Sequence, residues 1–337
     1  MYVLKVPLKQ ANSVKAQLIS NLLYDKSRIP VSDAASIYYP IKKKDKQLDN
    51  LGRYSRKVLP LVLSSNYQDK LKDAIPKILF ENLPKSYDII GDIILVDIKE
   101  ELLKYQKSIG EALLHSHKSI KTILKKTGIH EGEFRTQKYE CIAGIDTREA
   151  LYKENGVILK LDVEKVYFSP RLSTERKRIF KEIKPNENIL VMFSGCAPYP
   201  STISKNTLAK KIIGIEKNVI AHKYGQENLK LNKIKNVELI CGDVRNVVPT
   251  LNEKFDRIVM PLPKDADTFL DIAFNVATKG TIINLYDFEH ETELSLVNQK
   301  VELACKKFKI KYKILNVVKC GQYSPGKFRI CVDFEIL

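Results

Sequence analysis

Asn188-Ile-Leu-Val-Met-Phe193 runs directly into the small-residue turn Ser194-Gly-Cys-Ala-Pro-Tyr-Pro200, and this stretch decides the fold. Three further apolar runs follow it, at residues 211–216, 237–243 and 255–260. Helical stretches separate the runs, most clearly at residues 218–232. Short apolar runs that alternate with helices are typical of parallel strands in βαβ units. Ligands of such sheets bind beyond the carboxyl ends of the strands, so we expect a binding site there.

Acidic residues end two of these runs. Glu216 closes the second run and Asp243 closes the third, so both carboxylates fall at the edge where the turn lies. One acid can accept both hydroxyls of a ribose, and the other can face the amino group of an adenine. A dinucleotide would need a glycine-rich phosphate loop, whereas this turn holds only Gly195. The pattern favours adenosine carrying a sulfonium; an ordinary sheet whose strands end in acids is the alternative.

Composition and charge limit the class of protein. The 337 residues are 44% hydrophobic, enough for two or three globular domains. Lys and Arg number 57 against 40 acids, and the formal net charge of +17 favours a nucleic-acid partner. No apolar run approaches the roughly 18 residues of a membrane span, and there is no signal peptide, so we expect a cytoplasmic location. The six scattered cysteines and five histidines form no metal pattern, and no metal is expected.

The first sixty residues are the most basic part of the chain, with twelve Lys or Arg and four acids. Strands are predicted at residues 2–6 and 36–41, with a helix at 11–23 between them. These elements make a small α+β module over residues 1–60. The run Lys42, Lys43, Lys44 and Lys46 is expected to contact RNA phosphates, with a solvated loop as the alternative.

A second α+β domain is expected over residues 70–165, after a polar linker at 64–70. One long strand is predicted at 87–98, with a bulge at Gly91. Apolar spacing then predicts an amphipathic helix. This helix is predicted at residues 99–126. Three short strands are predicted after it, at residues 139–143, 147–152 and 157–163. Asn155-Gly156 signals a tight hairpin between the last two strands.

The third domain is expected over residues 166–337 and is the α/β sheet already introduced. Ser173 is the predicted N-cap of a helix that places Glu175 in its first turn. After the fourth strand, helices are predicted at 267–277 and 290–307, and strands at 280–286, 311–318 and 327–335. The last two strands are joined through residues 321–326 and are expected to pair antiparallel at the sheet edge. That topology is typical of class I, Rossmann-like methyltransferases.

Three segments resemble the archaeal and eukaryotic tRNA (guanine-37, N1) methyltransferases: Tyr167-Phe-Ser-Pro-Arg-Leu-Ser-Thr-Glu-Arg176, Met192-Phe-Ser-Gly-Cys-Ala-Pro198 and Asp243-Val-Arg245. The resemblance implies an enzyme that uses S-adenosylmethionine to methylate the guanine 3′ of the anticodon. It implies that the N-terminal module touches the tRNA elbow and that the catalytic domain acts at the anticodon loop. It also implies a monomer without an obligate protein partner.

The same resemblance assigns individual residues. Cofactor contacts would come from Tyr167, Phe193, Ser194, Gly195, Cys196, Pro198, Glu216, Lys217, Asp243 and Val244. Glu175 would be the general base that removes the N1 proton, and Arg135 would stabilise the charge that builds on O6. Without the resemblance, Glu175 is an acid favoured at a helix N-terminus, and Arg135 is a surface charge or phosphate contact. Arg171 is a further expected RNA contact.

Several positions depart from the pattern of that family. Val191 stands where many members have Asp, and Ala197 where they have Gly. Pro261-Leu-Pro263 replaces Asn-Leu-Pro, and Pro261 lacks the donor with which Asn can hold the target base. This departure resembles an archaeal subgroup linked to wyosine synthesis, which implies a second activity, methylation of C7 of 4-demethylwyosine to isowyosine. A wyosine-pathway aminocarboxypropyl transferase and a non-catalytic basic RNA-binding protein are the competing hypotheses.

Overall fold

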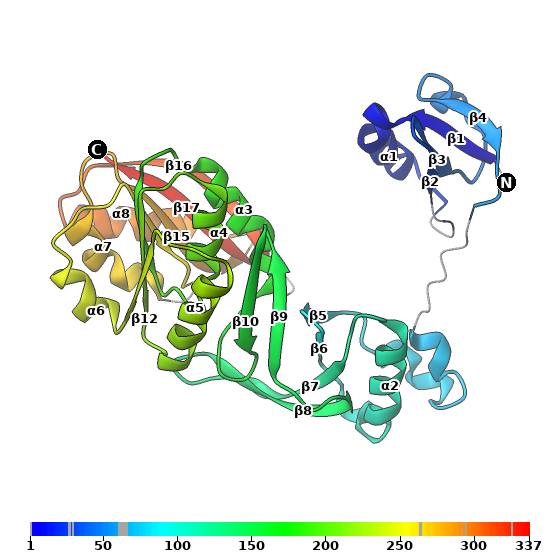
Figure 1. The fold of residues 1–337 in the computed structure, drawn as a ribbon, viewed down its shortest axis with the longest axis horizontal. Helices are drawn as coiled ribbons and strands as arrows, with labels where there is room; N and C mark the ends of the chain where they lie inside the picture. The colour runs from blue at the N-terminus through cyan, green and yellow to red at the C-terminus, as the bar shows by residue number, and fades with distance from the viewer. Residues whose placement is uncertain are drawn as a thin grey trace. The chain divides into compact units, whose positions relative to one another are not determined.

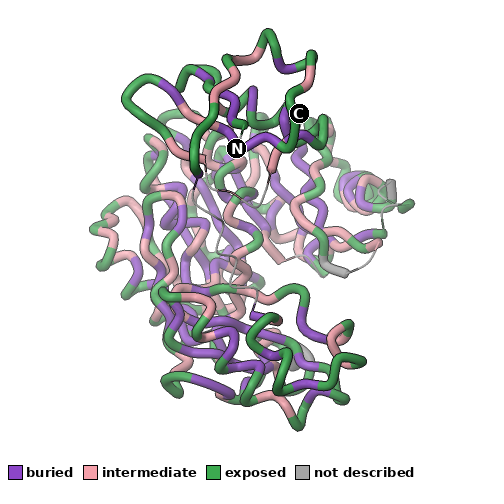
Figure 2. The backbone as a smooth tube through the Cα atoms, turned by 90° about the vertical axis from the view of Figure 1, so that its right-hand side faces the viewer, coloured by how far each residue is buried: buried purple, intermediate pink, exposed green. Residues whose placement is uncertain are grey.

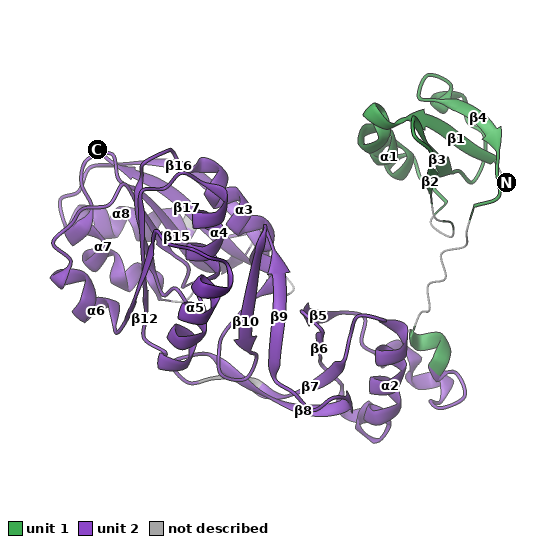
Figure 3. Ribbon diagram, in the orientation of Figure 1, with its two compact units in different colours: residues 1–70 green, residues 71–337 purple. Residues whose placement is uncertain are grey.

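The computed structural model describes residues 2–25, 28, 30–59, 67–262, 265–290, 292–293, 295–324 and 326–337. Residues 1–70 form one compact unit and residues 71–337 form another (Figure 3). The polar segment predicted as a linker is partly helical, because Tyr67–Leu71 forms a 3₁₀ turn. Residues 64–66 of that predicted linker lie outside the described part of the chain.

The first unit is an antiparallel sheet with one helix packed on it. Its strands pair in the order β2-β3-β1-β4. The elements are β1 (Tyr2–Pro7), α1 (Ala11–Ser20), β2 (Val31–Ser32), β3 (Ser36–Pro40) and β4 (Arg53–Arg56), with 3₁₀ turns at Leu8–Gln10 and Lys46–Leu48. Leu4 and Val6 of β1 pack against Val14 and Leu18 of α1. The predicted strands and helix are confirmed, although the helix ends three residues earlier than predicted.

The second unit begins with a smaller mixed sheet in the order β5-β6-β7-β8. Its elements are β5 (Tyr87–Ile90), β6 (Ile93–Val96), α2 (Gln106–Ser116), β7 (Thr122–Glu131) and β8 (Thr136–Gly144), with 3₁₀ turns at Lys77–Asn82 and Glu100–Tyr105. Strands β6 and β7 are parallel, and α2 lies in the connection between them. Pairs β5–β6 and β7–β8 are antiparallel.

Two predictions for this region were wrong. The single strand predicted at 87–98 is a hairpin, because Gly91 adopts a φ of +61° and turns the chain instead of forming a bulge. The helix predicted at 99–126 is a 3₁₀ turn followed by α2, and residues 122–126 belong to strand β7. Over so short a stretch, the adjacent apolar residues Ile123 and Leu124 fit both the 3.6-residue period of a helix and the apolar run of a buried strand.

A separate hairpin, β9 (Glu149–Glu154) and β10 (Val157–Asp162), joins the two sheets of this unit. Asn155 and Gly156 have φ values of +44° and +79°, so the predicted tight turn is confirmed. Asn228 of helix α5 (Val219–Leu231) accepts a hydrogen bond from the backbone N–H of Lys160 at 2.7 Å, and Asn232, just after that helix, accepts one from the N–H of Ile158 at 2.8 Å. These side chains satisfy the free edge of β10, which otherwise would lack partners.

The large sheet has seven strands in the order β13-β12-β11-β14-β15-β17-β16 (Figure 1). Its strands are β11 (Asn188–Met192), β12 (Lys211–Glu216), β13 (Val237–Cys241), β14 (Arg257–Met260), β15 (Ile282–His290), β16 (Tyr312–Ser324) and β17 (Lys327–Ile336). The first five are parallel, and β17 pairs antiparallel with both β15 and β16. This is the predicted class I, Rossmann-like order, with the antiparallel pair at the edge. The pair is longer than predicted, since β16 continues through residues 321–324.

Helices cover both faces of the large sheet. They are α3 (Ser173–Glu182), α4 (Pro198–Asn206), α5 (Val219–Leu231), α6 (Val244–Val247), α7 (Leu270–Val276) and α8 (Ser295–Lys307), with 3₁₀ turns at Pro170–Leu172, Val248–Thr250 and Ala266–Phe269. Helices α3 and α4 pack on one face, and α6, α7 and α8 pack on the other. Buried residues accordingly run through the interior strands (Figure 2).

The starts of helices α3 and α8 also differ from prediction. Ser173 is the first helical residue of α3, its φ and ψ are helical, and no side-chain cap is formed, so the predicted N-cap was wrong. Glu175 nevertheless lies in the first turn, as predicted. Helix α8 begins at Ser295, because β15 continues as far as His290.

Candidate active site

The turn after β11 is shaped to admit a ligand. Phe193, Gly195 and Ala197 have φ values of +60°, +57° and +64°, a conformation that side-chain-bearing residues rarely adopt. A Cβ added at Gly195 would meet no atom closer than the Tyr167 carbonyl oxygen at 4.0 Å, so open space lies above this residue. The Ser194 hydroxyl is buried and has no hydrogen-bond partner among the described residues. A strained turn with an unpaired hydroxyl and open space beside it fits a ligand site.

Two acids flank this turn at the ends of the neighbouring strands. Glu216 accepts hydrogen bonds from the backbone N–H groups of Gly195 and Asn218, each at 2.7 Å. Burial raises the pKa of Glu216, and the backbone donors partly oppose that shift. Asp243 caps helix α6 by accepting from the Arg245 N–H at 2.9 Å, and this bond, together with Lys217, lowers the pKa of Asp243. At neutral pH the site therefore presents Asp243 as an anion, which can accept hydrogen bonds from a ligand.

Lys217 links the sheet to the middle domain. Its ammonium lies 3.1 Å from Asp243 and also pairs with Glu133 in the β7–β8 turn. Arg135 follows two residues after Glu133 and has a φ of +51°. The ion pairs thus bring the turn that carries Arg135 to the carboxyl end of β12.

Several other residues predicted to bind the cofactor have side chains that are buried in the core. Cys196 and Val244 are buried at 0% and 4% exposure, so their side chains face the core. Burial raises the pKa of the Cys196 thiol to about 12, which leaves it inert. Phe193 packs on the core and meets the Phe269 ring edge-on at 4.9 Å between centroids. Pro198 is the first residue of α4.

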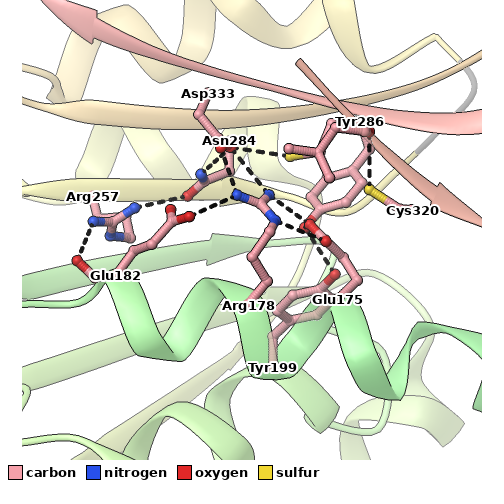
Figure 4. A network of polar contacts seen from close by, with 11 residues as sticks. Glu175, Arg178, Glu182, Tyr199, Arg257, Asn284, Tyr286, Cys320 and Asp333 are labelled. Atoms are coloured by element: carbon pink, nitrogen blue, oxygen red, sulfur yellow. Dashed lines mark hydrogen bonds and ion pairs between the residues drawn. The ribbon is translucent and has the colours of Figure 1, made fainter. Parts of the chain in front are cut away.

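Glu175 belongs to a buried polar network that is centred on Arg178 (Figure 4). Arg178 donates to both carboxylate oxygens of Glu175, from Nε to Oε2 at 2.9 Å and from Nη2 to Oε1 at 2.7 Å. The Tyr286 hydroxyl also donates to Oε1, at 2.7 Å. A carboxylate has about four lone-pair sites. These three donors therefore leave one acceptor site at Oε2, where a proton could be taken.

The network extends from Glu175 into the sheet. Arg178 donates through Nη1 to Asp333 at 2.6 Å and to Glu182 at 2.9 Å. The Tyr199 hydroxyl donates to the Tyr286 hydroxyl at 3.0 Å. Burial raises the pKa of both phenols far above neutrality, so both remain protonated donors. Glu175 is therefore held in one orientation from the side of the sheet.

Arg135 and a second arginine surround two aromatic rings. The guanidinium of Arg135 lies 5.2 Å from the ring centre of Tyr167 and 5.6 Å from that of Phe288. Arg329 lies 5.1 Å from the Phe288 ring and donates to the Tyr167 hydroxyl at 3.0 Å. Sequence reasoning identified Arg135 and Tyr167 but missed Phe288 and Arg329. The one signal for them was an arginine inside the apolar strand Phe328-Arg-Ile-Cys-Val332.

Pro261 directly follows β14, at the same carboxyl edge as Glu216 and Asp243. Met260 pairs with Leu285 of β15, which places Pro261 beside the strand that carries Tyr286 and Phe288. The Leu262 N–H donates to the Met260 carbonyl at 2.8 Å, so this turn closes on itself. Pro263, the last residue of the predicted motif, lies outside the described residues.

The predicted RNA contacts fall in different settings. Lys42, Lys43, Lys44 and Lys46 are exposed on the first unit. Lys44 lies over the rings of Tyr2 and Tyr54 at 4.7 and 5.5 Å. Arg171 belongs to the second unit and makes two hydrogen bonds to Asp88, at 2.7 and 3.1 Å, so its guanidinium is already engaged by a carboxylate.

No helix within the described ranges is long and apolar enough to cross a membrane. Among those same residues, no group of three or more His, Cys, Asp or Glu side chains could hold a metal ion.

Three named relatives match between 75% and 98% of this chain. The tRNA (guanine(37)-N(1))-methyltransferase Trm5b of Pyrococcus abyssi is 35% identical, over 98% of each chain. The tRNA (guanine(37)-N(1))/4-demethylwyosine(37)-methyltransferase Taw22 of Nanoarchaeum equitans is 35% identical over 75% of this chain and 100% of its own. The tRNA(Phe) (4-demethylwyosine(37)-C(7)) aminocarboxypropyltransferase of Pyrococcus horikoshii is 32% identical over 79% of this chain and 94% of its own.

Solved structures agree with these relatives. The crystal structure of Pyrococcus abyssi Trm5b has a TM-score of 0.74 at 35% identity, covering 100% of this chain and 99% of its own. A complex of aTrm5 with tRNALeu has a TM-score of 0.71 at 30% identity, covering 100% of both chains. Methanocaldococcus jannaschii TYW2 in complex with AdoMet has a TM-score of 0.57 at 26% identity, covering 75% of this chain and 100% of its own.

Two family descriptions match successive ranges of the chain. Residues 67–147 match the TYW2 N-terminal domain, and residues 150–315 match the TRM5/TYW2 methyltransferase domain. The second range contains Glu175, the turn after β11, Glu216 and Asp243. The resemblance drawn from the sequence is therefore confirmed, and this chain belongs to the TRM5/TYW2 family of S-adenosylmethionine-dependent methyltransferases.

Proposed function

We propose that this protein is a tRNA methyltransferase that transfers a methyl group to N1 of guanine-37, and that it also methylates C7 of 4-demethylwyosine. The observation that carries the proposal is the joint placement of Glu175, Arg135 and the turn after β11 in one unit, within a chain that aligns end to end with Trm5b. The relative named for both activities, Taw22, supports the second. A tRNA substrate also favours a cytoplasmic location, and the family resemblance favours a monomer that needs no protein partner.

We further propose a division of labour along the chain. Residues 1–60 would bind the tRNA elbow, residues 70–165 would carry Arg135 to the target base, and residues 166–337 would hold the cofactor and the base. Support comes from the compact first unit and from the separate family matches at 67–147 and 150–315.

S-adenosylmethionine fits the residues at the carboxyl edge. Gly195 leaves open space, Glu216 can accept from ribose hydroxyls, and Asp243 can accept from the adenine amino group. Tyr167 and the other predicted residues, the backbones of Cys196 and Val244 included, surround the same edge. The bound cofactor supplies a methyl group already activated by its sulfonium.

The remaining chemistry belongs to the chain. N1 of guanine carries a proton at neutral pH and must lose it before it can act as a nucleophile, and the open acceptor site on Glu175 Oε2 would take that proton. Charge then builds on O6, where the guanidinium of Arg135 would stabilise it. Tyr286 and Arg178 hold the Glu175 carboxylate in place. Part of the entropic cost of orienting this general base is therefore met when the protein folds.

A nucleoside digest analysed by mass spectrometry tests the proposal. The purified protein, S-adenosylmethionine and tRNA carrying guanine-37 should yield 1-methylguanosine, and tRNA carrying 4-demethylwyosine should yield isowyosine. An aminocarboxypropyl adduct with methylthioadenosine as co-product would instead assign the protein to the related aminocarboxypropyl transferases. That alternative is motivated by the match of residues 67–147 to the TYW2 N-terminal domain and by the similarity to the Pyrococcus horikoshii transferase. A lack of any product would favour the RNA-binding hypothesis.

The basic module makes a prediction about RNA affinity. A variant in which Ala replaces all four of Lys42, Lys43, Lys44 and Lys46 should bind tRNA with a weaker salt dependence. The slope of the logarithm of the association constant against the logarithm of salt concentration should fall by about two to four, since each phosphate contact contributes roughly 0.7–0.9. Filter binding at several salt concentrations measures this slope. The matched control replaces four exposed lysines of the other unit, Lys306, Lys307, Lys309 and Lys311. Equal slopes for both variants would remove the lysine run from the RNA interface.

A further inference from the structure

The guanidinium of Arg329 is a buried cation that no carboxylate of the described residues neutralises. Arg329 is 8% exposed, and its Nε has no hydrogen-bond partner within the described part of the chain. Its Nη2 donates to the Tyr167 hydroxyl, which carries no charge to balance it. A buried charge without an anion is costly, and a ligand rich in acceptors would supply the missing partner.

The position of Arg329 follows from strand register. Along β15 and β17, the directly opposed pairs Asn284–Asp333, Tyr286–Cys331 and Phe288–Arg329 lie on one face, the face covered by α3. The first pair binds Arg178 through Asp333, and the second binds Glu175 through Tyr286. Successive pairs are about 7 Å apart. The Phe288–Arg329 pair therefore lies one step beyond the Glu175 carboxylate, toward Tyr167 and Arg135.

We propose, resting on the function proposed above, that Arg329 binds the O6 and N7 edge of the target purine. A guanidinium binds these two acceptors of guanine through paired hydrogen bonds. Contact at that edge leaves N1 open on the adjacent Watson–Crick edge, where Glu175 can reach it. Arg329 would thereby supply the donor that Pro261 lacks, from a different strand. A third ring fused across N1 and the exocyclic nitrogen leaves the O6 and N7 edge intact, so the same contact suits both substrates.

The test pairs a substrate change with a protein change. Single-turnover methylation is measured with tRNA carrying guanine-37 or 7-deazaguanine-37, which lacks the N7 acceptor. The unaltered protein should react roughly tenfold to a hundredfold more slowly with the 7-deaza substrate. Arg329→Gln should be slow with guanine-37 and should show no further loss with 7-deazaguanine-37. Arg329→Lys keeps the charge without the planar fork, so its rate with guanine-37 should fall below that of the unaltered protein.

Controls distinguish base recognition from cofactor binding and from a general loss of charge. Lys327→Gln removes an exposed charge two residues earlier on the same strand and should keep the full dependence on N7. Calorimetric binding of S-adenosylmethionine should be the same for Arg329→Gln and the unaltered protein. Weakened cofactor binding with unchanged N7 dependence would assign Arg329 to the cofactor and overturn the inference. An unaltered protein that treats both tRNAs alike would also overturn it, whether or not the variants fold. If guanine-37 itself yields no 1-methylguanosine, the proposed function has failed instead.

Discussion

Glu175→Gln should lower the rate constant for methylation of guanine-37 by about 10²–10⁴-fold, the usual contribution of a positioned general base. Glutamine keeps the size and an acceptor oxygen but cannot take a proton. Arg178 would keep Asp333 and Glu182 as partners, so the network should survive the change. Single-turnover rates at saturating tRNA and S-adenosylmethionine measure the effect on the chemical step.

Glu182→Gln is the matched control for this experiment. Glu182 lies on the same helix α3 and binds the same Arg178. Unlike Glu175, it is partly exposed and accepts no hydrogen bond from Tyr286. Its replacement should change the rate less than about threefold, as expected for an exposed ion pair. If both variants lose activity equally, Glu175 acts only by positioning Arg178. A Glu175→Gln rate within about threefold of the unaltered protein would exclude the general-base role.

The sequence was sufficient to predict the strands that carry the cofactor site. Apolar runs at 188–193 and 211–216 are short and bounded by turn residues or acids, and βαβ connections fix their neighbours locally. Glu216 and Asp243 therefore fell at one edge in the prediction and in the structure. The hairpin at Asn155-Gly156 was equally predictable, because its turn chemistry is local.

The polar network could not be predicted in the same way. Arg178 and Asp333 are 155 residues apart, and Phe288 meets Arg329 only because β17 inserts between β15 and β16. No local sequence motif predicts the register of β17 against β15 and β16. Periodicity also failed at residues 122–126, where strand pairing with β8 prevails over a pattern compatible with a helix.

Arg176→Met should lower the free energy of unfolding by about 3–5 kcal/mol, the cost of removing one partner from a buried ion pair. Arg176 and Glu154 are buried to 2% and 1% exposure of their side chains. Arg176 binds both carboxylate oxygens of Glu154, donates to the Ser169 carbonyl at 3.2 Å, and lies over the Phe168 ring at 5.2 Å. Denaturant unfolding followed by circular dichroism measures the loss.

The double variant Arg176→Met/Glu154→Leu decides whether the charge itself is needed. If the single change is costly because it leaves Glu154 buried without a cation, removing both charges should recover most of the lost stability. Failure to recover would show that packing against Phe168 and the Ser169 carbonyl carries the contribution instead. Activity gives an independent measure, because the pair holds α3 against the β9–β10 hairpin and α3 carries Glu175. A stable double variant with slow methylation would mean that the ion pair sets the position of the general base Glu175. A stable and fully active double variant would mean that the ion pair contributes only to folding.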